Sequence, residues 1–225
     1  MGEDFILLYF YGIIFSKNPE DLSSGFFGGS YMEKTKTHII VKVGFLSALA
    51  FILMYLEFQV PLFPGFLKLD FSDLPALIGA FALGPVYGVM IELVKNLVHS
   101  TVTQSAGIGE IANFTVGSIF VYTAGIIYNR NKTRKNALFA MIISVFVMAF
   151  SASLLNYYVF LPLYQKVMGW PMDAIVGMGR SVNGSIVDVK TLVAYGIFPF
   201  NILKGVMLAT VTLLIYKKVS LLLKQ

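Results

Sequence analysis

The sequence predicts an all-α integral membrane protein with six transmembrane helices and both termini in the cytoplasm. Hydrophobic residues make up 57% of the 225 positions and charged residues only 13%, whereas soluble proteins average roughly 25% charged residues. The apolar residues form continuous runs of helical length, not the alternating pattern of barrel strands. Basic residues gather in the short segments between these runs, which is a signal of membrane topology.

The six predicted spans are apolar runs near the roughly 20 residues that a helix needs to cross a bilayer. In chain order they are Ile39 to Leu56, Leu74 to Leu83, Val86 to Val98, Asn113 to Tyr128, Ala137 to Tyr158 and Leu192 to Tyr216. The second run is short and stops at Gly84-Pro85, and the fourth is expected to begin near Gly109. A long polar excursion from Pro162 to Lys190 is predicted between the last two spans.

Residues 1–31 are predicted to lie outside the transmembrane domain, which we place at residues 32–225. The apolar stretch from Phe5 to Phe15 is too short to span and follows acidic residues, where a secretory signal would carry basic ones. The stretch from Pro19 to Tyr31 reads as a serine- and glycine-rich linker. We expect residues 1–31 to be a disordered or non-native extension, such as a misassigned upstream start, with Met32 as the natural start.

The distribution of basic residues predicts the orientation. The segments predicted to be cytoplasmic hold Lys34, Lys36, Lys42, Arg130, Lys132, Arg134, Lys135, Lys217, Lys218 and Lys224. The predicted outer segments hold only Lys68, Lys166, Arg180 and Lys190. This bias favours cytoplasmic termini by the positive-inside rule, and the opposite orientation would expose the basic loop from Asn129 to Lys135 on the outer face.

The composition excludes several kinds of site. The chain has no cysteine and only two histidines, so we predict no metal site and no catalytic cofactor. The sequence also lacks a P-loop and an evident protease dyad, so we do not expect an enzyme. A transporter built from this chain would take its energy from a partner or from an ion gradient.

Asn201 and Lys204 in the last span are the leading candidates for ligand contacts. They are three residues apart and therefore project from one helix face. Polar groups at membrane depth are costly and are functional candidates by default. A structural pair is the alternative, with Lys204 neutralised by Glu92 or snorkelling to the surface. The ligand-binding interpretation is favoured because Pro199 loosens the backbone just before the two residues.

Other polar residues have structural explanations of equal or greater weight. Asn156 ends the fifth span, where it could cap the helix or contact a ligand. Glu92, Lys95, Asn96 and His99 form one stripe on the third helix, which faces protein rather than lipid. The simplest explanation of Glu92 and Lys95 is that they neutralise each other.

The first outer loop, from Glu57 to Lys68, contains two prolines and a glycine, so it is not expected to be helical. Because it is rich in apolar residues, it either lies at the membrane interface or folds over a pocket as a lid. Asp70, Ser72 or Asp73 is predicted to cap the second helix. Glu110 opens the fourth helix on the same outer side.

Gly44 and Ala48 form a pair of small residues one turn apart in the first helix. Such a pair lets another helix approach closely. The approaching helix could belong to this chain or to a membrane partner, and the sequence leaves both possibilities open.

Six short motifs stand in a fixed order between residue 36 and about residue 218. They are Glu57-Phe58 through Pro64, Phe66-Leu67-Lys68-Leu69-Asp70-Phe71-Ser72-Asp73-Leu74-Pro75, Gly84-Pro85-Val86-Tyr87-Gly88, Lys95-Asn96-Leu97, Gly109-Glu110-Ile111-Ala112-Asn113-Phe114 and Asn201-Ile202-Leu203-Lys204. In order and spacing, they resemble the substrate-binding (S) components of the energy-coupling factor (ECF) vitamin transporters, specifically the riboflavin-specific branch.

The resemblance implies high-affinity riboflavin uptake across a prokaryotic cell membrane, with flavin mononucleotide left open as a second ligand. It also implies docking onto a membrane scaffold (T) subunit that is powered by two cytoplasmic ATPase subunits, with no nucleic acid involved. Its ligand-binding candidates on this chain are Asn201, Lys204, Asn156, Leu67, Phe66, Phe58, Asp70 and Glu110, and its docking candidates are Gly44 and Ala48. A pocket of apolar walls with a few amides suits a flavin.

Two other functions compete with this interpretation. A self-contained proton-coupled secondary transporter of a small metabolite would use Glu92 and Lys95 as a relay. An intramembrane enzyme is disfavoured because the sequence offers no credible nucleophile and base.

Overall fold

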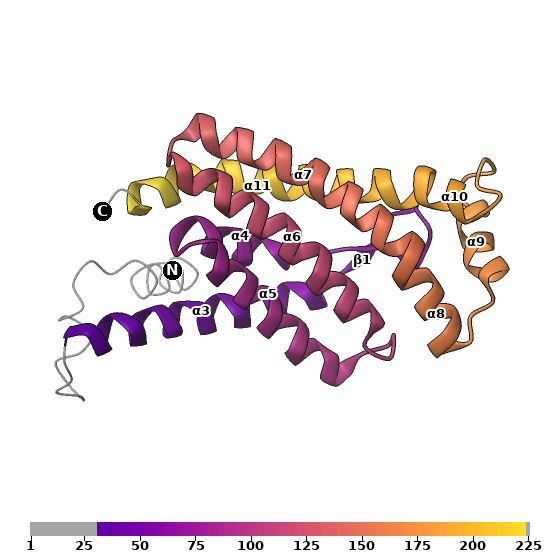
Figure 1. The fold of residues 1–225 in the computed structure, drawn as a ribbon, viewed down its shortest axis with the longest axis horizontal. Helices are drawn as coiled ribbons and strands as arrows, with labels where there is room; N and C mark the ends of the chain where they lie inside the picture. Colours follow the sequence, from indigo (N-terminus) through magenta and orange to yellow (C-terminus); the bar gives the residue numbers. More distant parts are fainter. Residues whose placement is uncertain (1–30, 224–225) are drawn as a thin grey trace, which may run out of the picture.

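The computed structural model describes residues 31–223 and shows an elongated bundle of helices (Figure 1). The extension predicted for residues 1–31 lies outside the described residues except for Tyr31, which begins the first described helix. The described elements are α3 (Tyr31–Tyr55), β1 (Phe58–Gln59), β2 (Lys68–Leu69), α4 (Asp73–Ala82), α5 (Pro85–His99), the 3-10 turn η1 (Ser100–Val102), α6 (Ile108–Arg130), α7 (Arg134–Leu155), the π-helical turn η2 (Asn156–Phe160), α8 (Leu161–Met168), α9 (Met172–Arg180), α10 (Val189–Leu192), the π-helical turn η3 (Val193–Ile197) and α11 (Phe198–Leu223).

Four helical stretches are long and apolar enough to cross a membrane. They are Thr37–Tyr55, Ile108–Arg130, Arg134–Met168 and Val189–Ile215. They coincide with the first, fourth, fifth and sixth spans predicted from the sequence. The second and third predicted spans are the shorter helices α4 and α5. The structure therefore confirms a helical membrane protein.

The predicted polar excursion from Pro162 to Lys190 is wrong in part. The fifth helix continues through η2 and α8 to Met168, and α9 forms a further helix within the same segment. Pro162 sits in the first turn of α8, directly after the π-helical turn η2, so the α-helical hydrogen-bond ladder is already interrupted where the proline lacks an N–H. The proline therefore lies inside the fifth helical stretch and does not end it.

The first outer loop is not helical, as its prolines and glycine predicted, and it forms a short hairpin. Strands β1 and β2 pair antiparallel, with Phe58 opposite Leu69 and Gln59 opposite Lys68. The Phe63 ring packs edge-on against Phe200 of α11, with ring centroids 5.4 Å apart. This contact folds the loop back onto the last helix.

The main core joins α3, α4, α5, α6, α7 and α11. Glycine allows close approach of helices in this core, since a Cβ on Gly88 of α5 would lie 2.5 Å from Val121 Cγ1 and 2.7 Å from Ala80 Cβ. No larger residue could sit at this crossing without displacing α4 or α6. A second, smaller core lies beneath α8, α9 and α10.

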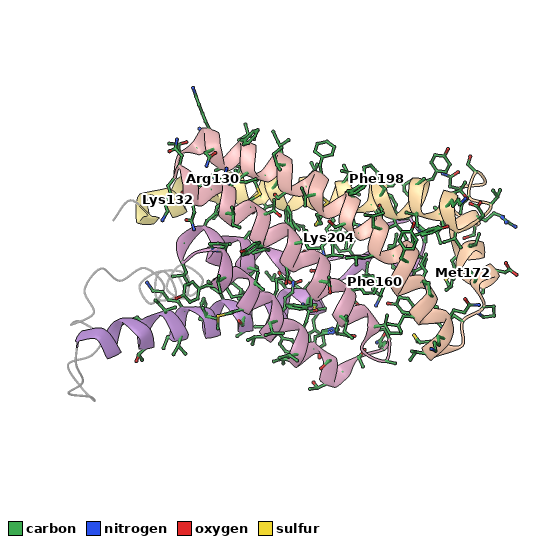
Figure 2. All side chains as sticks on the ribbon, in the orientation of Figure 1. Arg130, Lys132, Phe160, Met172, Phe198 and Lys204 are labelled. Atoms are coloured by element: carbon green, nitrogen blue, oxygen red, sulfur yellow. The ribbon has the colours of Figure 1, made fainter. Side chains whose placement is uncertain are left out.

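The two ends of the bundle are formed by different segments of the chain. The start of α3, the turn between α6 and α7 and the end of α11 lie at one end, where Arg130 and Lys132 project outward (Figures 1 and 2). The segments α8, α9 and α10 lie at the opposite end (Figure 1).

Candidate functional site

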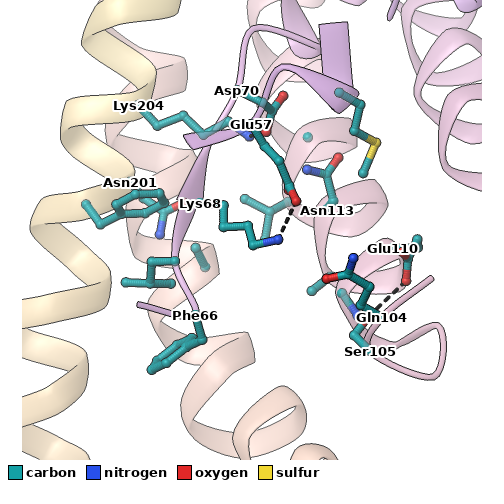
Figure 3. Close-up of a pocket in the computed structure, with 18 of the residues that line it drawn as sticks. Glu57, Phe66, Lys68, Asp70, Gln104, Ser105, Glu110, Asn113, Asn201 and Lys204 are labelled. Atoms are coloured by element: carbon teal, nitrogen blue, oxygen red, sulfur yellow. Dashed lines mark hydrogen bonds and ion pairs between the residues drawn. The ribbon is translucent and has the colours of Figure 1, made fainter. Parts of the chain in front are cut away.

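A cavity of about 860 Å³ lies between the β1–β2 hairpin and helices α6, α7, α8 and α11 (Figure 3). The hairpin contributes Gln59, Phe66 and Leu67, and helix α11 contributes Asn201 and Lys204. The volume lies within the range of roughly 300–1,000 Å³ that is typical of small-molecule sites. The hairpin therefore covers a pocket, as the lid alternative for this loop anticipated.

The structure brings most of the candidate ligand contacts together in this cavity. The candidates that line it are Asn201, Lys204, Asn156, Leu67, Phe66, Asp70 and Glu110. Phe58 is not in the lining, and its side chain on β1 is exposed. Binding by the lining residues stays a prediction.

The side-chain amides of Asn201 and Asn156 are each held by a hydrogen bond to a backbone carbonyl one turn earlier in the same helical stretch. The Asn201 Nδ2 donates to the Ile197 carbonyl at 2.8 Å, and the Asn156 Nδ2 donates to the Ala152 carbonyl at 2.8 Å. Asn156 stands at the C-cap position of α7 but is itself helical, and the helical chain continues through η2 and α8, so there is no free helix end at this residue.

Two π-helical turns stand beside the asparagines. Turn η2 begins at Asn156, and turn η3 ends at Ile197, whose carbonyl holds the Asn201 amide. Such turns are rare and are often found at functional sites. Each one shifts the register of the following helix and so sets which face the later side chains occupy.

Lys204 is buried between two carboxylates. Its Nζ lies 3.0 Å from Asp70 Oδ2 and 3.1 Å from Asp73 Oδ2. The structural alternative for this lysine is therefore right that carboxylates neutralise it but wrong about the partner, which is not Glu92, and the side chain does not snorkel to the surface. Its ammonium instead joins α11 to the segment that leads from the hairpin into α4 (Figure 3).

Lys95 extends this set of contacts away from the cavity. Its fully buried ammonium donates to Ser72 Oγ at 2.7 Å, pairs with Asp73, and lies 2.9 Å from Glu92 Oε2. The predicted Glu92–Lys95 pair is thus present, but Lys95 shares its charge with Asp73. We call Asp70, Lys204, Asp73, Lys95 and Glu92 the buried ion-pair chain.

The acids before α4 do not cap it through their side chains, contrary to the sequence prediction. Ser72 holds the cap position, but its side chain makes no capping hydrogen bond. Its N–H donates to Asp70 Oδ1 at 2.7 Å, and its hydroxyl accepts from Lys95. The carboxylates that were predicted to cap α4 from their spacing instead form ion pairs with the buried Lys95 and Lys204.

Glu110 lies at another edge of the cavity and has three side-chain partners. Its carboxylate accepts from Thr103 Oγ1 at 2.8 Å and from Ser105 Oγ at 3.0 Å, and it lies 2.9 Å from His99 Nδ1 (Figure 3). Nearby, Tyr164 stacks on Trp170 with ring centroids 5.7 Å apart.

Sequence reasoning missed several lining residues. Those not selected as ligand contacts include Gln104, Ser105, Tyr164, Trp170 and Met178. A polar loop between two apolar helices was the signal that could have identified Gln104 and Ser105.

Gly44 and Ala48 lie on the outer surface of α3. Both are exposed, and a Cβ on Gly44 would meet no atom within 4 Å. Ser47 turns inward instead and donates to the Val43 carbonyl at 2.8 Å. The described helices therefore leave this pair uncovered, so packing among the described residues does not explain it.

The fold and cavity define a class of protein, a helical membrane protein with a cavity of small-molecule size between a loop hairpin and its helices. The chain belongs to the family described as "ECF transporter, substrate-specific component", which it matches over residues 38–216. This confirms the family suggested by the motifs.

Individual relatives agree with the assignment. The chain is 36% identical to "Riboflavin transporter RibU" of Staphylococcus aureus (strain TCH60), covering 83% of this chain and 92% of that protein. It is 33% identical to "Riboflavin transporter FmnP" of Bacillus subtilis (strain 168), covering 82% and 93%. The solved structure titled "Structure and mechanism of the S component of a bacterial ECF transporter" matches with a TM-score of 0.67 at 35% identity, covering 84% of this chain and 99% of that one.

The buried ion-pair chain makes Asp73 important for stability. We expect Asp73→Ala to destabilise the ligand-free protein by about 1–3 kcal/mol, because Lys95 and Lys204 would each lose one of two carboxylate partners while staying buried. Thermal unfolding in detergent, followed by circular dichroism, measures this effect. Glu57→Ala is the control, since it breaks the partly exposed pair with Lys68, worth about 0–1 kcal/mol. Equal losses of stability in the two variants would contradict the assignment.

Proposed function

We propose that this chain captures riboflavin at the outer face of the bacterial cell membrane, as the substrate-binding subunit of an ECF transporter. The observation that carries the proposal is the meeting of Asn201, Lys204 and Asn156 in one cavity beneath the apolar hairpin. Both relatives compared above are named riboflavin transporters.

The chemistry of the cavity suits a flavin. The isoalloxazine ring has apolar faces, which Phe66, Leu67 and Trp170 can cover. Its edges carry hydrogen-bond donors and acceptors, and an asparagine amide can serve both. The ammonium of Lys204 can only donate, so it suits a carbonyl or a ribityl hydroxyl. Riboflavin is thus the transported ligand, and the family is a transporter component rather than an enzyme.

The subunit takes its energy from partners. The full sequence has no P-loop, so ATP hydrolysis falls to other chains. The partners are a membrane scaffold (T) subunit and two cytoplasmic ATPase subunits. Exposed Gly44 and Ala48 provide a smooth stripe on α3 onto which a scaffold helix docks.

The subunit crosses the cell membrane six times, with α4 and α5 completing the four long stretches. Both termini lie in the cytoplasm. This orientation is supported by the basic end of the bundle, where the start of α3, the turn at Arg130 and Lys132, and the end of α11 lie together (Figures 1 and 2).

A proton-coupled carrier acting alone is less well supported. Its relay would be Glu92 and Lys95, and neither residue lines the cavity. Family membership as a substrate-specific component favours a capture subunit instead.

We expect Asn201→Ala and Lys204→Ala each to weaken riboflavin binding at least tenfold, because each removes a buried partner worth about 1–3 kcal/mol. Titration of the purified protein with riboflavin, followed by quenching of flavin fluorescence, measures the affinity. Thr210→Ala is the control on the same helix, since its exposed hydroxyl bonds only to the Val206 carbonyl in the described structure. Unchanged affinity in both Asn201→Ala and Lys204→Ala would overturn the site.

We expect Gly44→Phe and Ala48→Phe to abolish co-purification with the scaffold and ATPase subunits while riboflavin binding persists. A bulky ring on this stripe blocks close helix approach. Leu138→Phe, on the exposed face of α7, is the control and should leave assembly intact. Assembly of both stripe variants at the level of the control would rule out this docking face.

The absence of native cysteines gives a direct test of topology. We expect Gly184→Cys to react with a membrane-impermeant maleimide in intact cells. Lys132→Cys should react only after permeabilisation, because its loop faces the cytoplasm. The reverse pattern would show the opposite orientation.

A further inference from the structure

The buried ion-pair chain is unbalanced. It contains the carboxylates of Asp70, Asp73 and Glu92 but only the ammonium groups of Lys95 and Lys204, and all five residues are at most 8% exposed. If all five were ionised, one negative charge would remain without a counterion. A buried charge without a partner is costly, so such a group usually becomes neutral instead.

Glu92 lies at one end of the buried ion-pair chain, and its carboxylate has the fewest hydrogen-bond donors of the three. Within the part of the protein that the structure describes, its Oε1 has no hydrogen-bond donor, and its Oε2 is within reach of only the Lys95 ammonium. The Lys95 ammonium lies 2.9 Å from Oε2, but it directs hydrogen bonds to Ser72 and Asp73. Glu92 is also completely buried, so water offers it no bulk solvation.

The surroundings of Glu92 have a shortage of donors. Helices α5 and α6 run antiparallel in a register fixed by three contacts: Gly88 with Val121, Glu92 with Gly117, and His99 with Glu110. The same register places Asn96 opposite Asn113. Within the described residues, the Oδ1 atoms of both asparagines are buried without a donor. The unpaired oxygens along this seam, on Glu92, Asn96 and Asn113, are therefore all acceptors.

We propose that Glu92 is a proton-binding site and that the ligand-binding form of the protein holds it as a neutral carboxylic acid. The proton comes from water and bonds to one carboxylate oxygen. It removes the excess charge of the buried ion-pair chain and supplies the seam with a hydrogen-bond donor. One proton thus accounts both for the excess negative charge and for the missing hydrogen-bond donor.

The packing favours a proton over a metal ion. A Cβ built on Gly117 would lie 2.6 Å from Glu92 Oε2, so the backbone of α6 presses directly on the carboxylate. The Lys95 ammonium occupies another side at 2.9 Å. Little room is left for a cation and the several oxygens that it would require.

The charged groups that act on Glu92 are few. They are Lys95 on the same helix, Asp73 at the start of α4 and Lys204 on α11. Helix α6 contributes Gly117 and no ionisable residue within a turn of it, and the buried residues of α3 that face inward are not ionisable.

The proton matters for ligand binding through Lys95 and Asp73, which makes Glu92 a positioning residue. An ionised Glu92 would compete with Asp73 for the Lys95 ammonium. Asp73 would then hold Lys204 more strongly and withdraw its ammonium from the cavity. This step rests on the proposed function, in which Lys204 contacts riboflavin.

Infrared spectroscopy tests the proton directly and needs no ligand. In an ester-free detergent at neutral pH, the wild-type protein should show the carbonyl-stretch band of a protonated carboxyl. Glu92→Gln should lose this band, and Asp173→Asn, at an exposed acid on α9, should retain it. Absence of the band from the wild type, or its persistence in Glu92→Gln, would overturn the proposal. Titration of the wild-type protein with base should also remove the band, which tests the proton without any variant.

Riboflavin affinity measured against pH tests the coupling. Affinity of the wild type should decline as the band disappears on the alkaline side. Glu92→Gln, which mimics the neutral acid, should bind as the wild type does at neutral pH and lose this decline. An unchanged decline in Glu92→Gln, or a dependence of the band on sodium rather than pH, would contradict the inference. Failure of the wild type to bind riboflavin would reject the proposed function and leave the infrared result standing.

Discussion

The position of the Lys204 ammonium between Asp70 and Asp73 is the contact on which the site depends. It joins residues 134 positions apart in the sequence, and it ties the last helix to the segment between the hairpin and α4. Because these groups are buried, the geometry of the ion pairs is tightly constrained: any separation would leave charges without partners. The same contact closes the inner part of the cavity and presents a cation to it.

The position of the hairpin depends on this contact. Its outgoing strand β2 ends at Leu69, directly before Asp70, and its turn is held by Phe63 against Phe200. Both attachments are to α11, the helix that also carries Asn201. A ligand in the cavity would thus be contacted both by the hairpin and by α11, the helix to which the hairpin is attached. The residues that bind the ligand and the loop that covers it are therefore held by the same contacts.

Local patterns in the sequence were sufficient to predict the long helices and seven of the residues that line the cavity. Hydrophobic runs identified the four long apolar stretches, and the prolines with a glycine identified the non-helical hairpin. The spacing of Asn201 and Lys204 placed both residues in the cavity. These features depend on neighbours within a few positions, which periodicity and turn chemistry describe well.

The errors concern interactions that sequence spacing cannot reveal. Asp70 and Asp73 were assigned to a helix cap because the cap was the nearest use for them, whereas their partners come from α5 and α11. The helical continuation past Tyr158 was missed because Pro162 usually signals an end. The exposure of Phe58 was missed because one residue of register decides which face of a strand is covered.

The two π-helical turns have a consequence for how such a pocket can arise and change. Each turn accommodates about one residue more than an α-helix would, and one residue corresponds to about 100° of rotation around the helix axis. Removing a single residue from η3 would therefore turn Asn201 and Lys204 away from their present direction without altering either side chain. Insertions and deletions, and not only substitutions, can thus re-aim the polar groups of this scaffold and change what it selects.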